Sequence, residues 1–268
     1  MGETDWVNQV SAEYATGRRL LLAFDFDGTL APIVAHPDLA AVPPATLAAL
    51  ESLAALDRVV VGVISGRALG NLRGCVGLAA VWYGGSGGMH LDLGGEEIID
   101  AGLSAFDRVA ESLVPAVAAV VGKHAGAWVE RKPGCLSVHF RALTPLGSAV
   151  LMEDVRDLVG GLGAKYPPLR VRVVSMAIEV ALAAAWTKDD AVGRMHAAHG
   201  GNPLVVYAGD GANDEEAVDW VNARRGVTVG IGPDAPWAAQ VRLPTPADLA
   251  QDLERLRAGC ARRPRVAE

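Results

Sequence analysis

The stretch LLAFDFDGTLAPIV, Leu21 to Val34, carries the signal on which the fold prediction depends. The apolar run Leu20–Phe26 indicates a strand buried on both faces, yet Asp25 and Asp27 stand at its end. Residues two apart in a strand share a face, so we expect both carboxylates to project together from the carboxyl end of the strand. Their repulsion calls for a cation or a shared proton. Such a pair suits a nucleophile beside a general acid and base, although a turn after a strand is the ordinary alternative.

Strands and helices alternate on both sides of this stretch. In the first third, the pattern predicts strands at residues 20–26, 58–65 and 79–83 and helices at residues 45–56 and 69–76. In the last third, it predicts helices at residues 188–199, 214–223 and 247–257 and strands at residues 204–208 and 226–229. Buried strands separated by helices are typical of a parallel sheet, so the predicted class is α/β with a Rossmann-like core.

The middle of the chain has a different pattern. Residues 127–132 and 135–142 alternate in polarity around a Pro-Gly turn, which predicts a β-hairpin with one solvent-exposed face. A helix at residues 147–162 and a second hairpin at residues 169–175 and 177–182 follow. We therefore predict an α+β domain at residues 104–184, inserted into a core formed by residues 1–103 and 185–268. The ligand site is expected in the cleft between the two domains.

Composition excludes several classes of protein. The chain has 268 residues and a formal net charge of −7, with no basic tract, so we expect neither a nucleic acid nor a membrane surface as partner. Its three cysteines are far apart and in no CxxC spacing, which argues against a disulfide framework or a zinc ribbon. Charges interrupt the longest apolar region, residues 103–122, and the first residues lack a signal-peptide pattern. We expect a cytoplasmic protein.

Four polar signatures occur in order along the core, each at a predicted strand end or helix start. Each of the first three, taken alone, has an ordinary structural explanation, whereas the last is a costly acidic cluster to leave without a cation. They contribute Asp25, Asp27 and Thr29 in DFDGT, Ser65, Gly66 and Arg67 in ISGR, Lys188 in TKDD, and Asp210 and Asp214 in GDGANDEE. Together they resemble the signatures of the haloacid dehalogenase (HAD) superfamily of phosphotransferases.

The resemblance implies a Mg²⁺-dependent phosphomonoester hydrolase. The carboxylates of Asp25 and Asp210 would bind the ion, with Asp27 contributing its backbone carbonyl and Asp214 binding directly or through water. In this chemistry Asp25 attacks phosphorus and forms an aspartyl-phosphate, and Asp27 protonates the leaving alcohol and then activates water.

The remaining signature residues would hold the phosphate. Ser65, Lys188 and backbone N–H groups would bind the phosphoryl oxygens where charge spreads in the transition state. Thr29 offers a hydroxyl and an N–H group to an anion, and Gly66 and Arg67 complete the expected substrate-binding set around the phosphate.

Within the superfamily, the chain resembles trehalose-6-phosphate phosphatases. The match includes DFDGTLAPIV, ISGR, VERK, CLSVHFR, IEV and TKDDAV. The insert lies between the second and third signatures, the position of the larger, C2-type cap domain, which favours small phosphorylated metabolites. The resemblance implies sugar binding by Glu130, Lys132 and Glu179, and alternation adds His139 and Arg141 on the paired strand. A solvated sheet face with cross-strand ion pairs is the ordinary alternative.

Departures from the family pattern leave the sugar open. Ala181-Leu182 replace an Arg-Pro pair, and GSGGMH places Gly87 and His90 where His and Glu usually stand. A related disaccharide, pseudo-disaccharide or glycosyl-glycerate phosphate is therefore an alternative substrate, and His90 is either a ligand or a surface histidine. Two other classes stay open: a dinucleotide-binding protein that uses GGSGGM, which leaves DFDGT unexplained, and a catalytically silent module, against which the intact signatures argue.

Overall fold

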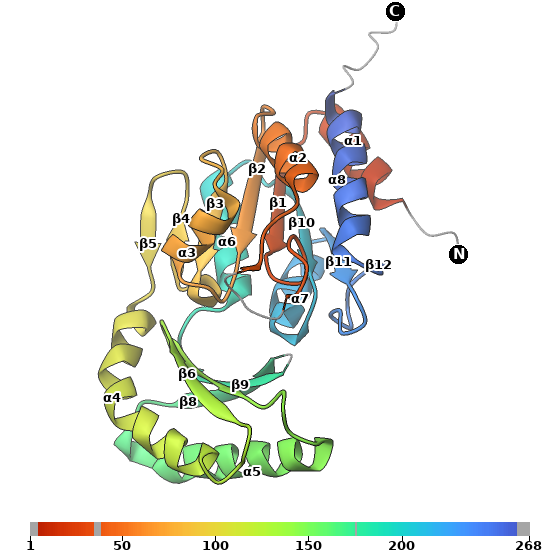
Figure 1. Ribbon diagram of the computed structural model, residues 1–268. Helices are drawn as coiled ribbons and strands as arrows, with labels where there is room; N and C mark the ends of the chain where they lie inside the picture. The colour runs from red at the N-terminus through yellow and green to blue at the C-terminus, as the bar shows by residue number, and fades with distance from the viewer. Residues whose placement is uncertain (1–4, 35–38, 175, 262–268) are drawn as a thin grey trace, which may run out of the picture. The chain divides into compact units, whose positions relative to one another are not determined.

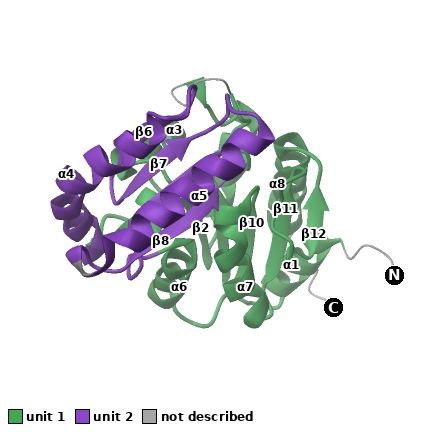
Figure 2. Cartoon of the chain, turned by 90° about the horizontal axis from the view of Figure 1, so that it is seen from below, with its two compact units in different colours: residues 1–98, 187–268 green, residues 99–186 purple. Residues whose placement is uncertain are grey.

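The computed structural model describes residues 5–34, 39–174 and 176–261. The chain divides into two compact units, which are coloured separately in Figure 2. Unit 1 consists of Met1–Ile98 and Thr187–Glu268, and unit 2 of Ile99–Trp186. The domain borders that we predicted, residues 104 and 184, fall inside unit 2. Within the described part of the chain, no helix is both long enough and apolar enough to span a bilayer.

Unit 1 is built on a mostly parallel sheet, which confirms the predicted α/β class. Its strands, over the described residues, run in the order β12-β11-β10-β1-β2-β3-β4-β5. Neighbours from β12 through β3 are parallel, and β4 is antiparallel to β3. The strands are β1 Leu20–Asp25, β2 Val59–Ile64, β3 Trp82–Gly85, β4 His90–Asp92, β5 Glu97–Ile99, β10 Leu204–Gly209, β11 Val227–Ile231 and β12 Val241–Leu243.

Helices cover both faces of this sheet, as continuous apolar strands require. Figure 1 shows α2 and α8 in front of the sheet and α6 behind it. The helices of unit 1 are α1 Trp6–Ala15, α2 Pro44–Ala54, α3 Leu69–Val76, α6 Lys188–His199, α7 Glu215–Ala223 and α8 Pro246–Ala261. The sequence prediction missed helix α1 and the three-residue strands β4, β5 and β12, which lie toward the two ends of the sheet.

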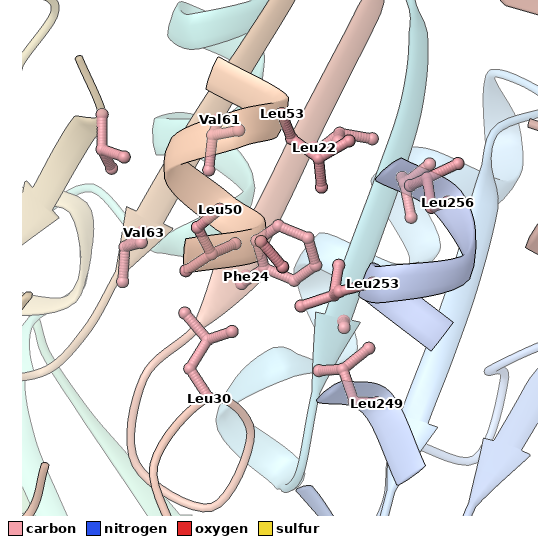
Figure 3. Close-up of a cluster of buried hydrophobic side chains, with 14 of the residues drawn as sticks. Leu22, Phe24, Leu30, Leu50, Leu53, Val61, Val63, Leu249, Leu253 and Leu256 are labelled. Atoms are coloured by element: carbon pink, nitrogen blue, oxygen red, sulfur yellow. The ribbon is translucent and has the colours of Figure 1, made fainter. Parts of the chain in front are cut away.

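The main core of unit 1 lies between the sheet and the layer that contains α2 and α8. Leu22 and Phe24 alternate with residues of the opposite face of β1 and are fully buried. Figure 3 shows them packed against leucines of α2 and α8 and against Val61 and Val63 of β2. Burying one such side chain contributes roughly 1.5–3 kcal/mol. This packing fixes β1, and with it the position of Asp25 at the end of the strand.

The segment between β3 and β4 forms no α-helix. Ser86–Gly88 forms a short 3-10 turn, η2, and the chain then enters β4. A dinucleotide site needs a helix N-terminus directly after its glycine-rich turn to receive the pyrophosphate. The dinucleotide-binding alternative based on GGSGGM is therefore wrong for this segment.

Unit 2 is an α+β domain with an antiparallel sheet. Its strands pair in the order β6-β7-β9-β8, and Figure 2 shows α4 and α5 lying over them. Leu136, Val138, Ile178 and Val180 are fully buried and form an apolar face of the sheet. The opposite face, called the polar face below, carries Ser137, His139 and Glu179 together with small residues such as Ala177 and Ala181. The elements are α4 Ala101–Val121, β6 Trp128–Lys132, β7 Cys135–His139, α5 Pro145–Leu162, β8 Leu169–Val174 and β9 Ala177–Leu182.

Candidate active site

The polar signatures of unit 1 meet at the carboxyl edge of its sheet. Asp25 is the last residue of β1 and pairs in register with Ile64, the last residue of β2, which Ser65 follows. On the other side of β1, Phe24 pairs with Ala208 of β10, and Asp210 follows that strand. Parallel register therefore brings three strand ends together at the edge where open α/β sheets bind ligands.

Asp25, Lys188 and Asp214 form a buried chain of ion pairs. Lys188 Nζ lies 2.5 Å from Asp25 Oδ1 and 2.7 Å from Asp214 Oδ1. The side chain of Asp25 is 5% exposed, that of Lys188 is 4% exposed, and that of Asp214 is fully buried. Lys188 is the first residue of α6, so the start of that helix delivers one cation to two carboxylates.

Asp214 also organises the loop after β10. Its Oδ2 accepts hydrogen bonds from the backbone N–H groups of Asp210 and Gly211, at 3.1 and 3.2 Å. The hydroxyl of Tyr207 donates to Asp214 Oδ1 at 2.5 Å. Sequence analysis missed Tyr207, although a tyrosine within the buried strand LVVYAG was a usable signal, because a buried phenol needs a hydrogen-bond partner.

Burial and mutual repulsion shift the titration of this cluster. Burial first, and then the charges of Asp214 and Asp210, raise the pKa of Asp25 well above its usual range, against the opposing effect of Lys188. Burial and Asp214 likewise raise the pKa of Asp210 to about 7. Burial alone would lower the pKa of Lys188, but the carboxylates of Asp214 and Asp25 outweigh it and the pKa is raised. The lysine stays charged, and the acids are in excess over it.

This excess of acids fits a divalent cation. Carboxylate oxygens of Asp25, Asp210 and Asp214 all lie within 4.8 Å of one another. Hard cations such as Mg²⁺ prefer oxygen ligands of this kind, and a cation would offset the repulsion that raises the pKa values of Asp25 and Asp210. The donor set therefore fits the predicted metal, and it joins three of the four predicted ligands.

Gly28 is required by the close approach of this cluster to the turn after β1. Its φ of 85° lies in the left-handed region, and a Cβ at this position would overlap the carboxylate of Asp210. The N–H of Gly28 donates to Ala31 O at 2.8 Å, which closes the turn. The glycine of the first signature therefore makes room for the aspartate of the fourth.

Asp27 has a different environment from Asp25. Its side chain is 44% exposed, and both of its oxygens accept hydrogen bonds from Arg67, at 2.8 Å from Nε and 2.6 Å from Nη2. We expected the repulsion between the two carboxylates to call for a cation or a shared proton. Instead, Asp25 pairs with Lys188 and Asp27 pairs with Arg67, because the strand ends at Asp25 and the chain then turns. Arg67, predicted to bind substrate, orients Asp27.

Ser65 and Thr29 are the two hydroxyls of the predicted phosphate-binding set. Ser65 is buried, and its Oγ accepts a hydrogen bond from the N–H of Arg67 at 3.2 Å. Thr29 is fully buried, and its hydroxyl forms no hydrogen bond within the described residues. Gly66 is exposed beside Ser65, and the space that a Cβ would occupy there is open.

Four of the predicted sugar-binding residues share the polar face of the sheet in unit 2. Glu130 lies opposite Ser137, which in turn lies opposite Glu179, so the two acids stand in one row across three strands. Glu130 Oε2 lies 2.8 Å from His139 Nε2 and 3.7 Å from Lys132 Nζ. The face thus presents acidic and basic groups side by side, joined by ion pairs.

Two expectations for single residues change. Arg141 does not share a strand face with His139, because β7 ends at His139 and a turn closed by Leu143 N–H on Phe140 O leads the chain toward α5. Arg141 is exposed in that turn. His90 lies in unit 1, where its Nε2 is 3.2 Å from Glu97 Oε2 in an ion-pair group with Arg73. That contact favours a structural role for His90.

Comparison with known proteins identifies what the chain is similar to. The family model described as trehalose-phosphatase matches residues 23–248. "Probable trehalose-phosphate phosphatase 4" of Oryza sativa subsp. japonica is 31% identical over 227 residues, which cover 82% of this chain and 60% of that protein. The trehalose-phosphate phosphatase of Mycobacterium tuberculosis is 33% identical over 261 residues, covering 91% and 63%. The chain therefore spans about three fifths of the length of these relatives.

Solved structures share the fold. The C-terminal domain of trehalose-6-phosphate phosphatase from C. albicans matches with a TM-score of 0.79 at 22% identity, over 94% of this chain and 96% of that one. A subclass IIB sugar phosphatase of the HAD superfamily matches with a TM-score of 0.59 at 16% identity, over 90% and 99%.

Proposed function

The chain belongs to the trehalose-phosphatase family, and from this premise we propose that it is a Mg²⁺-dependent phosphatase whose substrate is trehalose 6-phosphate. The observation that carries the proposal is the buried ion-pair chain of Asp25, Lys188 and Asp214 with Asp210 beside it, at the carboxyl edge of a parallel sheet. Burying more carboxylates than cations costs several kcal/mol. A bound divalent cation would offset that excess of negative charge and would let an anionic phosphate ester approach Asp25.

Asp25 is the proposed nucleophile. A carboxylate oxygen of Asp25 forms a bond to phosphorus as the bond from phosphorus to the sugar oxygen breaks, which leaves an aspartyl-phosphate. Lys188, already 2.5 Å from Asp25 Oδ1, is placed to bind a phosphoryl oxygen as charge develops. Ser65, at the end of the adjacent strand, supplies a further hydrogen-bonding group.

Asp27 is the proposed general acid and base. It protonates the sugar oxygen as that oxygen leaves, and it then takes a proton from the water that cleaves the aspartyl-phosphate. Arg67 fixes the orientation of the carboxyl group through two hydrogen bonds, and the exposure of Asp27 leaves it accessible to both the leaving group and water.

The metal would be held by carboxylates of Asp25, Asp210 and Asp214, with the backbone carbonyl of Asp27 as a further ligand. Bound there, Mg²⁺ would supply positive charge that lowers the repulsion between an anionic nucleophile and an anionic phosphate.

The polar sheet face of unit 2 is the proposed sugar-binding surface. Glu130 and Glu179 accept hydrogen bonds from sugar hydroxyls, and Lys132 donates to them. Recognition of this kind is selective, because a substrate that lacks a hydroxyl leaves a polar group unpaired.

A related disaccharide, pseudo-disaccharide or glycosyl-glycerate phosphate is the second candidate substrate. The departure at Ala181 favours it, because Ala181 lies opposite Cys135 in the same row of the sheet as Lys132. A small residue replaces the family's arginine beside the proposed sugar-binding residues, which alters the space and charge there.

Phosphate release from a panel of esters tests the proposal. The panel contains trehalose 6-phosphate, sucrose 6-phosphate, a glycosyl-phosphoglycerate, glucose 6-phosphate and glycerol 3-phosphate, each with Mg²⁺ and with EDTA. We expect Mg²⁺-dependent release with the highest kcat/KM for trehalose 6-phosphate, and no turnover by Asp25→Asn. Preference for another ester would keep the mechanism and change the substrate, whereas wild-type rates for Asp25→Asn would refute the mechanism.

A further inference from the structure

Trp128 is a large aromatic side chain on the polar face of the sheet in unit 2. It is the first residue of β6, and alternation places it on the same face as Glu130 and Lys132. Trp128 is 54% exposed, although tryptophan is usually among the more buried residues of a protein. None of the steps proposed for phosphate transfer uses it.

His139 holds the indole ring in a fixed orientation. The two residues lie directly opposite each other in the β6–β7 ladder, with ring centroids 3.9 Å apart and ring planes 21° apart. His139 is in turn 2.8 Å from Glu130 Oε2. The imidazole therefore covers one face of the indole and is itself anchored to a proposed sugar ligand, and Trp128 stays more than half exposed beside it.

We infer that Trp128 is a specificity-determining residue that stacks against a pyranose ring of the substrate, an inference that rests on the proposed function. One face of a pyranose ring presents C–H groups, which carry partial positive charge and are attracted to the electron-rich face of an indole. The hydroxyls at the rim of the same ring point outward, where Glu130 and Lys132 accept and donate hydrogen bonds. An apolar body with polar groups beside it is the arrangement that a sugar needs from its site.

An aromatic pair across neighbouring strands can also serve stability alone, and the two roles give different results. A purely structural pair at Trp128 and His139 would contribute roughly equally to every reaction of the folded enzyme. A stacking residue acts only on substrates that carry a ring. The distinguishing quantity is therefore the KM for a sugar phosphate compared with the KM for an acyclic phosphate ester.

The kinetic test uses the full chain with Mg²⁺ and two substrates, trehalose 6-phosphate and glycerol 3-phosphate. Trp128→Ala should raise the KM for trehalose 6-phosphate about tenfold or more, change kcat little, and leave kcat/KM for glycerol 3-phosphate within about twofold. Trp128→Phe, which keeps a flat ring, should restore most of the loss. Val150→Ala, at an exposed apolar position on α5, is the matched control and should change neither substrate's KM.

A binding titration separates this inference from the proposed function. Trehalose 6-phosphate is added to the Asp25→Asn protein while tryptophan fluorescence is followed. The fluorescence change should be much smaller in Asp25→Asn/Trp128→Phe, which keeps five tryptophans, although binding persists by calorimetry. A fluorescence change that depends on Trp128 would support the inference even if the wild type hydrolysed no ester. Equal KM changes for both substrates would overturn it. So would a fluorescence change of undiminished size after removal of Trp128, because the other five tryptophans would then account for the whole signal.

Discussion

Asp210→Asn should reduce the pH dependence of stability that the metal-free protein shows between pH 5 and pH 8. The pKa of Asp210 is raised from 3.8 to about 7 in the folded state, by burial first and by Asp214 next, against the opposing effect of Lys188. Between these two values the folded state binds more protons than the unfolded state. The free energy of unfolding therefore falls as the pH rises through this window, and the loss is nearly complete at pH 8.

The size of the effect follows from the shift. One pKa unit corresponds to about 1.4 kcal/mol. A carboxyl whose pKa is near 7 in the folded state and near 4 in the unfolded state therefore lowers the free energy of unfolding by about 3 kcal/mol between pH 5 and pH 8. The asparagine variant cannot ionise at this position, so its free energy of unfolding should fall by about 3 kcal/mol less than that of the wild type over the same interval.

Urea denaturation in EDTA at pH 5, 6, 7 and 8 measures this difference. Asp219→Asn, at an exposed position on α7, is the control and should keep the wild-type slope. At pH 8, adding Mg²⁺ to about 10 mM, a concentration intended to saturate the site, should raise the free energy of unfolding of the wild type but not that of Asp210→Asn. Parallel pH curves for the wild type and Asp210→Asn would refute the view that Asp210 is strained by burial and by its acidic neighbours.

Three further changes test other parts of the two proposed sites. Gly28→Ala should lose Mg²⁺-dependent phosphatase activity and about 1–2 kcal/mol of stability, because the new Cβ would overlap Asp210 and because residue 28 has a φ of 85°. Enzyme kinetics and urea denaturation measure the two losses. Lys188→Met leaves Asp25 facing Asp214 without a cation, so urea denaturation at pH 7.5 should show that the free energy of unfolding falls by about 3–5 kcal/mol. An unchanged denaturation midpoint would contradict the stabilising role of the buried ion pairs. Glu179→Ala should lower kcat/KM at least about tenfold for trehalose 6-phosphate but not for glycerol 3-phosphate, and equal losses would remove it from sugar recognition.

Local patterns determined the fold class and the order of the signatures. Apolar runs marked β1, β2 and β10 because strands buried on both faces are continuous, and the alternation of VERK and CLSVH marked a hairpin with one polar face. The signature residues stand at strand ends and helix starts, which are positions that a sequence shows directly. Short strands such as β12 went unpredicted, since three residues carry too little periodicity.

Only the tertiary structure decided which charged groups meet. Lys188 reaches Asp25 across 163 residues of sequence, and Tyr207 joins Asp214, a contact that no spacing rule predicts. Arg67 pairs with Asp27, whereas Arg141 leaves the strand on which alternation placed it. Periodicity records the neighbours of a residue along the chain, but hydrogen bonds and pKa shifts depend on distances of a few Å between segments that packing brings together, and those distances exist only in the folded chain.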